Sequence, residues 1–172
     1  MTEPASTLVM VVEIPKGSRN KYELDHVTGE IFLDRMLFTA TRYPADYGFL
    51  PDTLAEDGDP LDALALVNEP TFPGCRVRLR PIGLFLMEDQ GKPDHKVIGV
   101  PIGDPVWAHV QRLEDLPQHL LKEIEHFFSV YKDLELKATA THGFRDLAET
   151  HTVIERSRAA YFAEHHPAAQ EP

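Results

Sequence analysis

The chain has 172 residues, of which 42% are hydrophobic and 26% charged, so it can bury a core and is not a disordered protein. Its formal net charge of −11 disfavours nucleic acids and anionic membranes as partners, because both select basic surfaces. The single cysteine, Cys75, cannot form an internal disulfide and suits the reducing cytoplasm, where we expect the protein. No apolar run is long enough for a membrane span or a signal peptide. We expect one domain over residues 1–172.

Short strands separated by Gly, Pro and Asp are predicted over the first two-thirds of the chain. Leu8–Ile14 has the apolar pattern of a buried strand. Asn20–Asp25 and Ile31–Arg35 flank a turn at residues 27–30, which predicts a hairpin. Three further strands are expected: Asp62–Val67, Arg76–Met87 and Lys96–Val100.

The apolar pattern becomes helical in the last third. Apolar residues recur on one face of Pro117–Tyr131, which predicts a helix there. A second helix is expected from about Phe144 to Glu164, followed by a tail, His165–Pro172, that we expect to fray. About five strands followed by helices indicate the α+β class, with a small β-barrel flanked by helices.

An acidic stretch from Tyr43 to Cys75 contains no Lys or Arg and seven acidic residues. At its centre lies Asp57-Gly58-Asp59-Pro60-Leu61-Asp62, in which carboxylates crowd around a turn. Oxygen ligands of this kind select Mg²⁺, Mn²⁺ or Ca²⁺. An EF-hand is excluded, because that loop would need Gly where Asp62 stands. The alternative is an acidic loop that is merely solvated.

A second acidic group, Glu88, Asp89 and Asp94, surrounds a sequence typical of a polar hairpin loop. Charges also interrupt the predicted strands, where solvated edge positions are the simpler interpretation: Glu13, Lys21, Glu23 and Arg35. Charges of both signs on adjoining strands would instead line a polar cavity, because buried charge must be paired or bound to a ligand.

Tyrosines accompany these charges. Tyr43 and Tyr47 bracket a predicted turn, where they can pack or donate hydrogen bonds to an anion. Tyr131 and Lys132 follow the first predicted helix, where the helix dipole alone would explain a lysine.

Together these segments resemble the soluble family I inorganic pyrophosphatases of bacteria, over about Val11 to Lys137. The motifs that carry the resemblance are Glu13-Ile14-Pro15, Asn20-Lys21-Tyr22-Glu23, Asp34-Arg35, the segments 43–48 and 57–62, and His126-Phe127-Phe128 through Glu135. The resemblance implies an OB-like five-stranded β-barrel with flanking helices and a homohexamer. It also implies hydrolysis of pyrophosphate to two phosphates with several Mg²⁺ ions, for which Mn²⁺ or Zn²⁺ would substitute.

The same resemblance implies which residues form the site. Carboxylates would hold the metal ions, with Asp62 bridging two of them: Asp57, Asp62, Asp89, Asp94, Glu13 and Glu23. Cationic and phenolic side chains would bind the phosphates: Lys21, Arg35, Tyr43, Lys96, Tyr131 and Lys132. Asp59 would be the general base near the attacking water, and Tyr47, with Arg35 and Lys132, would complete the catalytic group.

One residue departs from the family pattern. Gln90 stands where members often have Glu after the aspartate equivalent to Asp89. One negative charge near the substrate's metal is thereby lost, so we expect the site to be retained with weaker metal affinity.

Two other classes of protein compete with this interpretation. A non-enzymatic cation-binding barrel is disfavoured by Lys21, Arg35 and Lys132, because a plain cation site gains nothing from nearby positive charge. Another metal-dependent phosphohydrolase, such as a nuclease or nucleotidase, is disfavoured for polymeric substrates by the net charge of −11.

Overall fold

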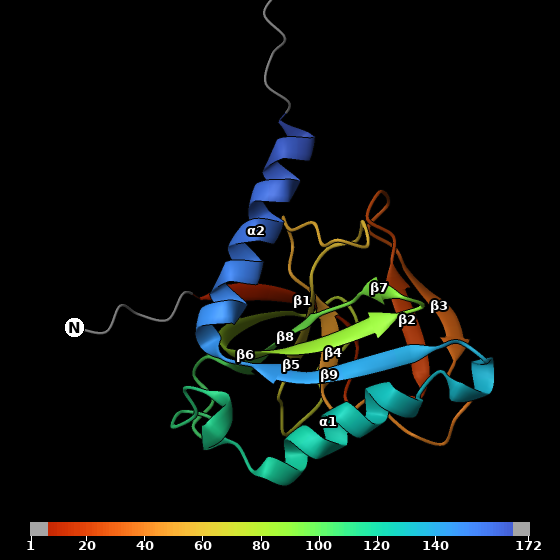
Figure 1. The fold of residues 1–172 in the computed structure, drawn as a ribbon, viewed down its shortest axis with the longest axis horizontal. Coiled ribbons are helices and arrows are strands. Elements are labelled where there is room, and N and C mark those ends of the chain that lie inside the picture. The colour runs from red at the N-terminus through yellow and green to blue at the C-terminus, as the bar shows by residue number, and fades with distance from the viewer. Residues whose placement is uncertain (1–6, 167–172) are drawn as a thin grey trace, which may run out of the picture.

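The computed structural model describes residues 7–166, and its centre is a ring of five paired strands (Figure 1). In the order in which they pair, these are β1 (Leu8–Ile14), β4 (Asp46–Phe49), β5 (Asp62–Ala65), β8 (Lys96–Pro101) and β6 (Arg76–Asp89). β6 pairs back onto β1 with Leu8 opposite Leu79, which closes the ring. β5 and β8 run parallel, whereas the other neighbours in the ring are antiparallel.

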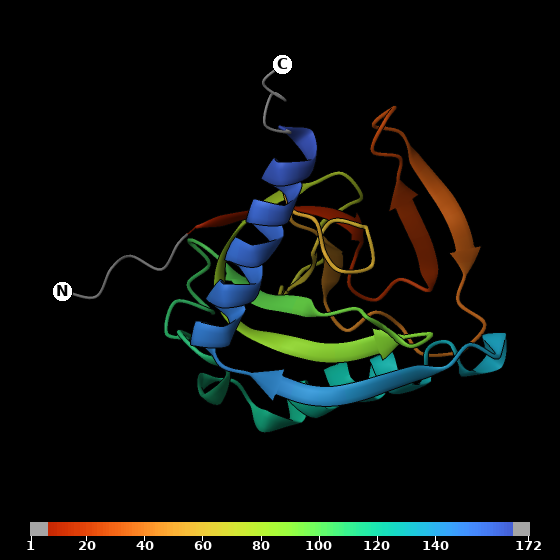
Figure 2. The ribbon, with the colours of Figure 1, turned by 45° about the horizontal axis from the view of Figure 1, so that its top comes forward.

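The predicted hairpin is confirmed as a separate two-stranded sheet of β2 (Asn20–Leu24) and β3 (Ile31–Met36). It stands to one side of the ring, as Figure 2 shows. Two more strands pair with β6, namely β7 (Lys92–Pro93) and β9 (Thr139–Arg145). With the helices, these strands confirm the α+β class.

The structure corrects the sequence analysis at two places. The second helix was expected from about Phe144, but Phe144 belongs to β9 and pairs with Phe85 of β6. Tyr47 was placed beside a turn, but it lies within β4. Both segments are short and partly polar, so their strand conformation depends on pairing with a neighbouring strand and cannot be predicted from the local sequence pattern.

Two helices cover different parts of the ring (Figures 1 and 2). α1 (Gln118–Val130) buries Phe127 and Phe128 in a core shared with Phe85. α2 (Leu147–His165) buries Val153 and Ile154 in a second core, with Leu61 and Leu84 among its members. Two single 3₁₀ turns are η1 (Leu113–Asp115) and η2 (Asp133–Glu135).

The ends of α2 follow local chemistry. Asp146 accepts a hydrogen bond from the backbone N–H of Glu149 at 2.9 Å, which satisfies one free donor of the first turn. The tail was expected to fray from His165, but α2 includes His165, and the backbone N–H of His166 donates to the oxygen of Phe162 at 2.8 Å. Residues 167–172 of the expected tail lie outside the described residues. Neither helix in residues 7–166 combines the length and apolarity needed to cross a membrane.

Glycine is required where β4 crosses close to β1. A Cβ on Gly48 would lie 1.9 Å from the backbone oxygen of Val11. The absence of a side chain therefore lets β4 approach β1 and holds its neighbour Tyr47 in register with Ile14.

Candidate active site

A polar cavity of about 550 Å³ opens between the ring, the β2–β3 hairpin and the segment after α1. The charged and phenolic side chains that line it include all but one of those that the sequence analysis assigned to the site. They are Glu13, Lys21, Glu23, Arg35, Tyr43, Tyr47, Asp57, Asp59, Asp62, Asp89, Asp94, Tyr131 and Lys132. The fold thus brings together groups from segments that are far apart in the sequence.

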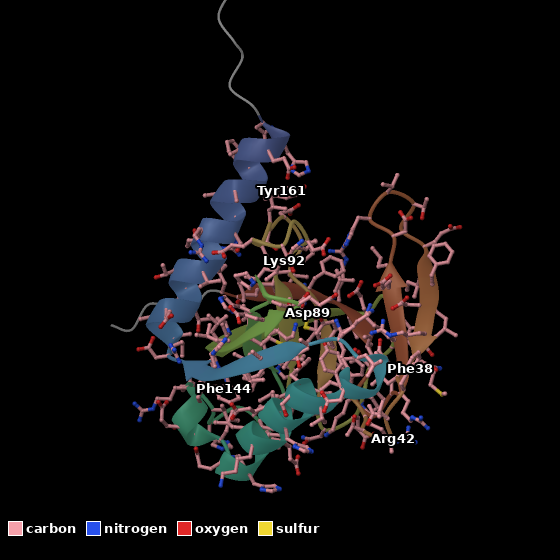
Figure 3. The ribbon with its side chains drawn as sticks, turned by 45° about the vertical axis from the view of Figure 1, so that its right-hand side comes forward. Phe38, Arg42, Asp89, Lys92, Phe144 and Tyr161 are labelled. Atoms are coloured by element: carbon pink, nitrogen blue, oxygen red, sulfur yellow. The ribbon has the colours of Figure 1, made fainter. Side chains whose placement is uncertain are left out.

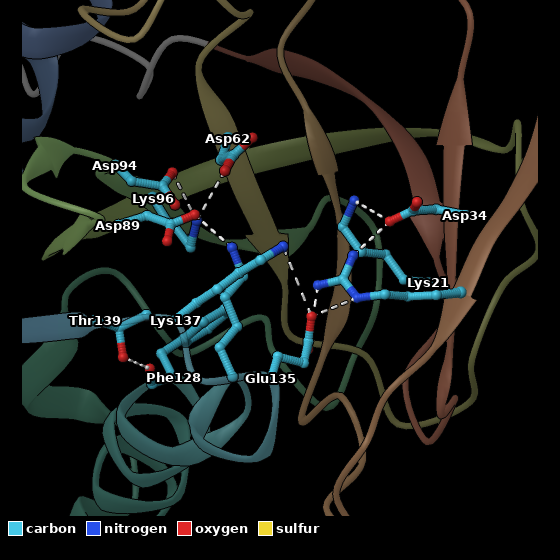
Figure 4. Close-up of polar contacts among 12 residues, drawn as sticks. Lys21, Asp34, Asp62, Asp89, Asp94, Lys96, Phe128, Glu135, Lys137 and Thr139 are labelled. Atoms are coloured by element: carbon cyan, nitrogen blue, oxygen red, sulfur yellow. Dashed lines mark hydrogen bonds and ion pairs between the residues drawn. The ribbon is translucent and has the colours of Figure 1, made fainter.

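Lys96 is the exception, because it lies beneath the cavity with 0% of its side chain exposed. Its Nζ donates to Asp62 Oδ2 at 2.8 Å and to Asp94 Oδ1 at 2.9 Å (Figure 4). Asp62 and Lys96 are register partners on the parallel strands β5 and β8, which accounts for their contact. The ammonium, to which the resemblance assigns phosphate binding, pairs with two carboxylates in this structure.

Burial and charge act together on this group. Burial raises the pKa of Asp62 to about 7, although Lys96 opposes the rise. Burial also favours a higher pKa for Asp94, but Lys96, Asp62 and Lys132 together outweigh it and the pKa of Asp94 is lowered. Burial alone would lower the pKa of Lys96, whereas Asp62 and Asp94 raise it, so the ammonium stays charged. Burial therefore favours the protonated form of Asp62.

Tyrosine hydroxyls face the same carboxylates. The Tyr47 hydroxyl donates to Asp62 Oδ2 at 2.5 Å. Burial raises the pKa of Tyr43, Tyr47 and Tyr131 well above 10.0. The three phenols stay protonated and can donate hydrogen bonds to carboxylate or phosphate oxygens.

A second ionic group joins the hairpin to the segment after α1. Lys21 Nζ lies 2.5 Å from Glu23 Oε1 and 3.2 Å from Asp34 Oδ2. Arg35 pairs with Asp34 at 2.5 Å and with Glu135 of η2 at 2.7 Å (Figure 4). Burial would lower the pKa of Arg35, but Glu135 and Asp34 raise it, so this guanidinium is held charged at the cavity wall.

A third group lies at the end of α1. Lys132 follows α1 with 8% of its residue surface exposed, and its ammonium pairs with Asp89 at the end of β6. The other carboxylate oxygen of Asp89, Oδ1, is buried without a hydrogen-bond partner. Figure 3 shows Asp89 near the centre of this view, and it is the last residue of β6, paired with Lys92 on one side and Thr139 on the other. A buried carboxylate oxygen without a hydrogen-bond partner is suited to bind a cation, because a bound cation would compensate for the loss of its contact with water.

The remaining carboxylates stand at the rim. Asp57 accepts a hydrogen bond from the backbone N–H of Asp59 at 3.0 Å, and burial raises the pKa of Asp57. Glu13 accepts one from the backbone N–H of Leu24 at 3.0 Å, which ties β1 to the hairpin. Burial raises the pKa of Glu13 as well.

Sequence reasoning missed several members of the cavity wall. They are His26, Asp34 and Lys137, which line the cavity, and Glu135, which pairs with Arg35. Asp34 and Glu135 belong to motifs that carried the resemblance, so their place in those motifs was the available signal. Gln90 adopts a left-handed conformation, with φ of 50°, and its backbone N–H donates to the oxygen of Ala138.

The donor chemistry of the cavity fits hard divalent cations. Its aspartates offer oxygen donors, as Mg²⁺ prefers. Within residues 7–166, no three His, Cys, Asp or Glu side chains are already arranged as a complete cage. Mg²⁺ sites on phosphate substrates use one or two carboxylates and fill their other positions with water and phosphate, so an open set suffices.

A cavity that combines carboxylate oxygens with fixed Lys and Arg side chains is typical of enzymes that process phosphates with the help of divalent cations. The family model for inorganic pyrophosphatase matches residues 10–162. The chain belongs to the inorganic pyrophosphatase family.

Individual relatives agree with this assignment. The chain is 51% identical to an inorganic pyrophosphatase of Leifsonia xyli over 158 residues, covering 91% of this chain and 97% of the relative. It is 50% identical over 161 residues to one of Methanosarcina mazei, covering 94% and 95%. The solved inorganic pyrophosphatase of Helicobacter pylori superposes with a TM-score of 0.89 at 42% identity, covering 93% and 96% of the two chains.

The family resemblance stated from the sequence is thereby confirmed. Its extent was underestimated, because the match was expected to fade after Lys137 and instead continues to residue 162. Most of α2 therefore lies within the part of the chain that the family shares.

Proposed function

We propose that this chain hydrolyses inorganic pyrophosphate to two phosphates, with Mg²⁺ as the cofactor and Mn²⁺ or Zn²⁺ as substitutes. One observation carries the proposal, namely that aspartates from three segments meet Lys21, Arg35 and Lys132 in one cavity of a chain of this family. Pyrophosphate is a small and highly charged anion. Carboxylates alone would repel it, so a site of this composition needs cations together with fixed basic groups.

The acidic residues divide the work of holding these ions. Asp57, Asp62 and Asp94 would hold the principal ion, with Asp62 bridging to a second. Asp89, with Asp94, would hold the ion that arrives with the substrate, and Glu13 and Glu23 would complete the acidic wall. Bound divalent cations supply charge neutralisation and lower the pKa of the attacking water. Lys96 supports Asp62 and Asp94 from below, where its contacts of 2.8 and 2.9 Å place it.

The remaining groups act on water and phosphate. Asp59, exposed at the rim, would accept the proton of the attacking water. Arg35 and Lys132 would stabilise negative charge that develops on the leaving phosphate, because phosphoryl transfer depends mainly on positioning and electrostatics. Lys21, Tyr43 and Tyr131 would hold the phosphate oxygens. Lys96 reaches a phosphate only if Asp62 and Asp94 turn away toward cations.

The closed pairing of five strands supports a further structural proposal. We infer that the ring is an OB-like barrel and that residues 1–172 work as one catalytic domain. The β1–β6 pairing removes the open sheet edge that these strands would otherwise present. Location in the cytoplasm stays a prediction.

An exposed apolar surface supports assembly into a homo-oligomer, for which the resemblance implies a hexamer. Large hydrophobic side chains stand exposed along β3 and just after it: Ile31, Phe32, Leu33, Met36 and Phe38. Several large apolar side chains exposed on one strand and just after it are typical of protein–protein contacts. Light scattering tests this proposal, and a mass near one chain of 19.4 kDa would contradict it.

A Mg²⁺ titration of phosphate release tests the proposed function. Purified chain should release phosphate from pyrophosphate only when a divalent cation is added, and far faster than from nucleoside triphosphates. No release at any Mg²⁺ concentration would contradict the enzyme assignment. Faster release from nucleotides would favour the general phosphohydrolase instead.

A further inference from the structure

We propose that α2 supports the acidic loop from behind, with Arg156 as a positioning residue for Asp57 and Asp59. The acidic loop is defined as residues 50–61, between β4 and β5. The inference rests on the proposed function, because it concerns Asp57, which would hold a Mg²⁺ ion, and Asp59, which would accept the proton of the attacking water. Figure 2 shows this loop between α2 and the β2–β3 hairpin, with α2 behind it as seen from the catalytic cavity.

The base of the acidic loop is fixed by its own hydrogen bonds. The backbone N–H of Leu50 donates to the oxygen of Leu61 at 2.9 Å. Buried Thr53 donates from its hydroxyl to the Leu50 oxygen at 2.6 Å and accepts from the Leu61 N–H at 2.9 Å. These bonds anchor both ends of the loop but leave residues 54–60 to be held by other contacts.

The tip of the loop turns about Ala55. The backbone N–H of Ala55 donates to the oxygen of Asp59 at 2.7 Å, and that of Gly58 donates to the oxygen of Ala55 at 3.1 Å. Gly58 has φ of 92°, which glycine adopts without strain. Because the Ala55 backbone bonds to this turn on both sides, the position of Ala55 sets where Asp57 and Asp59 stand.

α2 holds the residues on either side of Ala55. The backbone N–H of Leu54 donates to the oxygen of Ser157 at 2.9 Å, and Arg156 Nη2 lies 2.8 Å from Glu56 Oε1. A mainly apolar cavity of about 240 Å³ lies between the loop and the helix. Side-chain packing is therefore incomplete there, and these two polar contacts carry much of the restraint.

Arg156 also reduces the electrostatic repulsion within the acidic loop. The acidic stretch from Tyr43 to Cys75 contains no basic residue of its own. Glu56, Asp57 and Asp59 repel one another, and repulsion favours an open loop. Arg156 supplies a positive charge from a distant part of the chain, on the side of the loop away from the catalytic cavity.

Substitution of Arg156 should change Mg²⁺ binding without unfolding the chain. Arg156 and Glu56 are 59% and 51% exposed, and exposed ion pairs contribute little to global stability. Arg156→Ala should therefore weaken Mg²⁺ binding by about two- to fivefold, the range expected for one such pair, with an unchanged melting temperature. Turnover at saturating Mg²⁺ should fall by no more than a similar factor, because the loop that carries Asp59 is loosened and the Asp59 carboxylate itself is kept.

The matched control is Arg158→Ala. Arg158 belongs to the same helix and makes an exposed pair of similar length, 2.9 Å, but its partner is Glu155 of α2 rather than a loop residue. Isothermal titration calorimetry with Mg²⁺ on the full chain, without substrate, measures the binding directly. The Mg²⁺ dependence of phosphate release provides the second measurement.

A charge exchange makes the test specific. Arg156→Glu should weaken Mg²⁺ binding more than Arg156→Ala, and adding Glu56→Arg should restore it. Mg²⁺ binding equal in Arg156→Ala and Arg158→Ala would overturn the inference, as would a double variant no better than Arg156→Glu. If the wild type releases no phosphate, the proposed function fails, whereas calorimetry still decides whether Arg156 positions the loop.

Discussion

Arg35 and Glu135 are 100 residues apart in the sequence, yet Arg35 Nε lies 2.7 Å from Glu135 Oε1. The Glu135 side chain is 4% exposed, so little water competes for it. Glu135 also accepts a hydrogen bond from Arg35 Nη2 at 3.3 Å, and a carboxylate that contacts two nitrogens of one guanidinium restricts the orientation of that group. Glu135 therefore sets how Arg35 faces the cavity.

Glu135→Gln tests this relationship. The amide keeps the size of the side chain but loses the charge-assisted bond, so kcat/KM for pyrophosphate should fall by about ten- to hundredfold. Lys137→Ala is the control, because Lys137 lies 3.9 Å from the same carboxylate but is 44% exposed. Equal losses in the two variants would mean that Glu135 only contributes to the overall charge of the cavity and does not orient the Arg35 guanidinium.

Lys132→Ala should lower turnover while leaving the fold intact. Lys132 follows the last apolar turn of α1, and its ammonium forms an ion pair with Asp89, so its removal should cost little packing in the hydrophobic core. Removing it takes positive charge from the leaving phosphate, and about tenfold or more in kcat should be lost. Circular dichroism serves as the check, since an unfolded variant would show that Lys132 is structural.

Asp59→Asn and Asp62→Asn should separate a proton acceptor from a metal ligand. Asp62→Asn should need far more Mg²⁺ and recover poorly, because a bridging carboxylate is lost. Asp59→Asn should shift its Mg²⁺ dependence less, while turnover falls by roughly 10²- to 10⁴-fold, as for loss of a general base. Raising the pH should partly rescue Asp59→Asn, because more of the attacking water is then already deprotonated. Phosphate release across Mg²⁺ concentration and pH measures both.

Equal Mg²⁺ shifts in the two variants, with no rescue by pH, would mean that both residues are simply ligands. Both variants should stay folded in chelator. Asp59 is exposed, and Lys96 keeps Asp94 as its partner when Asp62 becomes Asn, so we expect both folds to survive and melting curves provide the control.

The raised pKa of Asp62 has a consequence for the metal-free chain. Its pKa is about 7 in the folded protein, against 3.8 for an ordinary Asp. The folded state therefore binds the proton more tightly, and this carboxyl lowers stability progressively as pH rises through that interval. Asp94 titrates below the interval and Lys96 above it, since their pKa values are lowered and raised respectively.

Thermal melting in chelator measures this effect. The melting temperature of Asp62→Asn minus that of the wild type should increase as pH rises from 3.8 to about 7 and then level off. Parallel curves for the two proteins over that range would show that Asp62 does not carry the titration.

Local pattern was enough to predict some elements and not others. Leu8–Ile14 and the β2–β3 hairpin could be predicted because alternation and turn residues lie within the segments themselves. Thr139–Arg145 could not, because its strand conformation depends on pairing with β6. The same limit applies to the site, since motifs identified its aspartates, whereas only the fold shows that Lys96 lies beneath them.

Closure of the strand ring has a consequence for how the protein becomes active. The pairing of Leu8 with Leu79 joins distant parts of the chain. Such a contact forms slowly, because the residues between the two strands must first lose conformational entropy. Until β1 docks, Glu13 is not in place against Leu24, and one edge of β6 is open to other chains. We expect enzyme activity to return in the slowest phase of refolding, and dilute conditions to favour its recovery over aggregation.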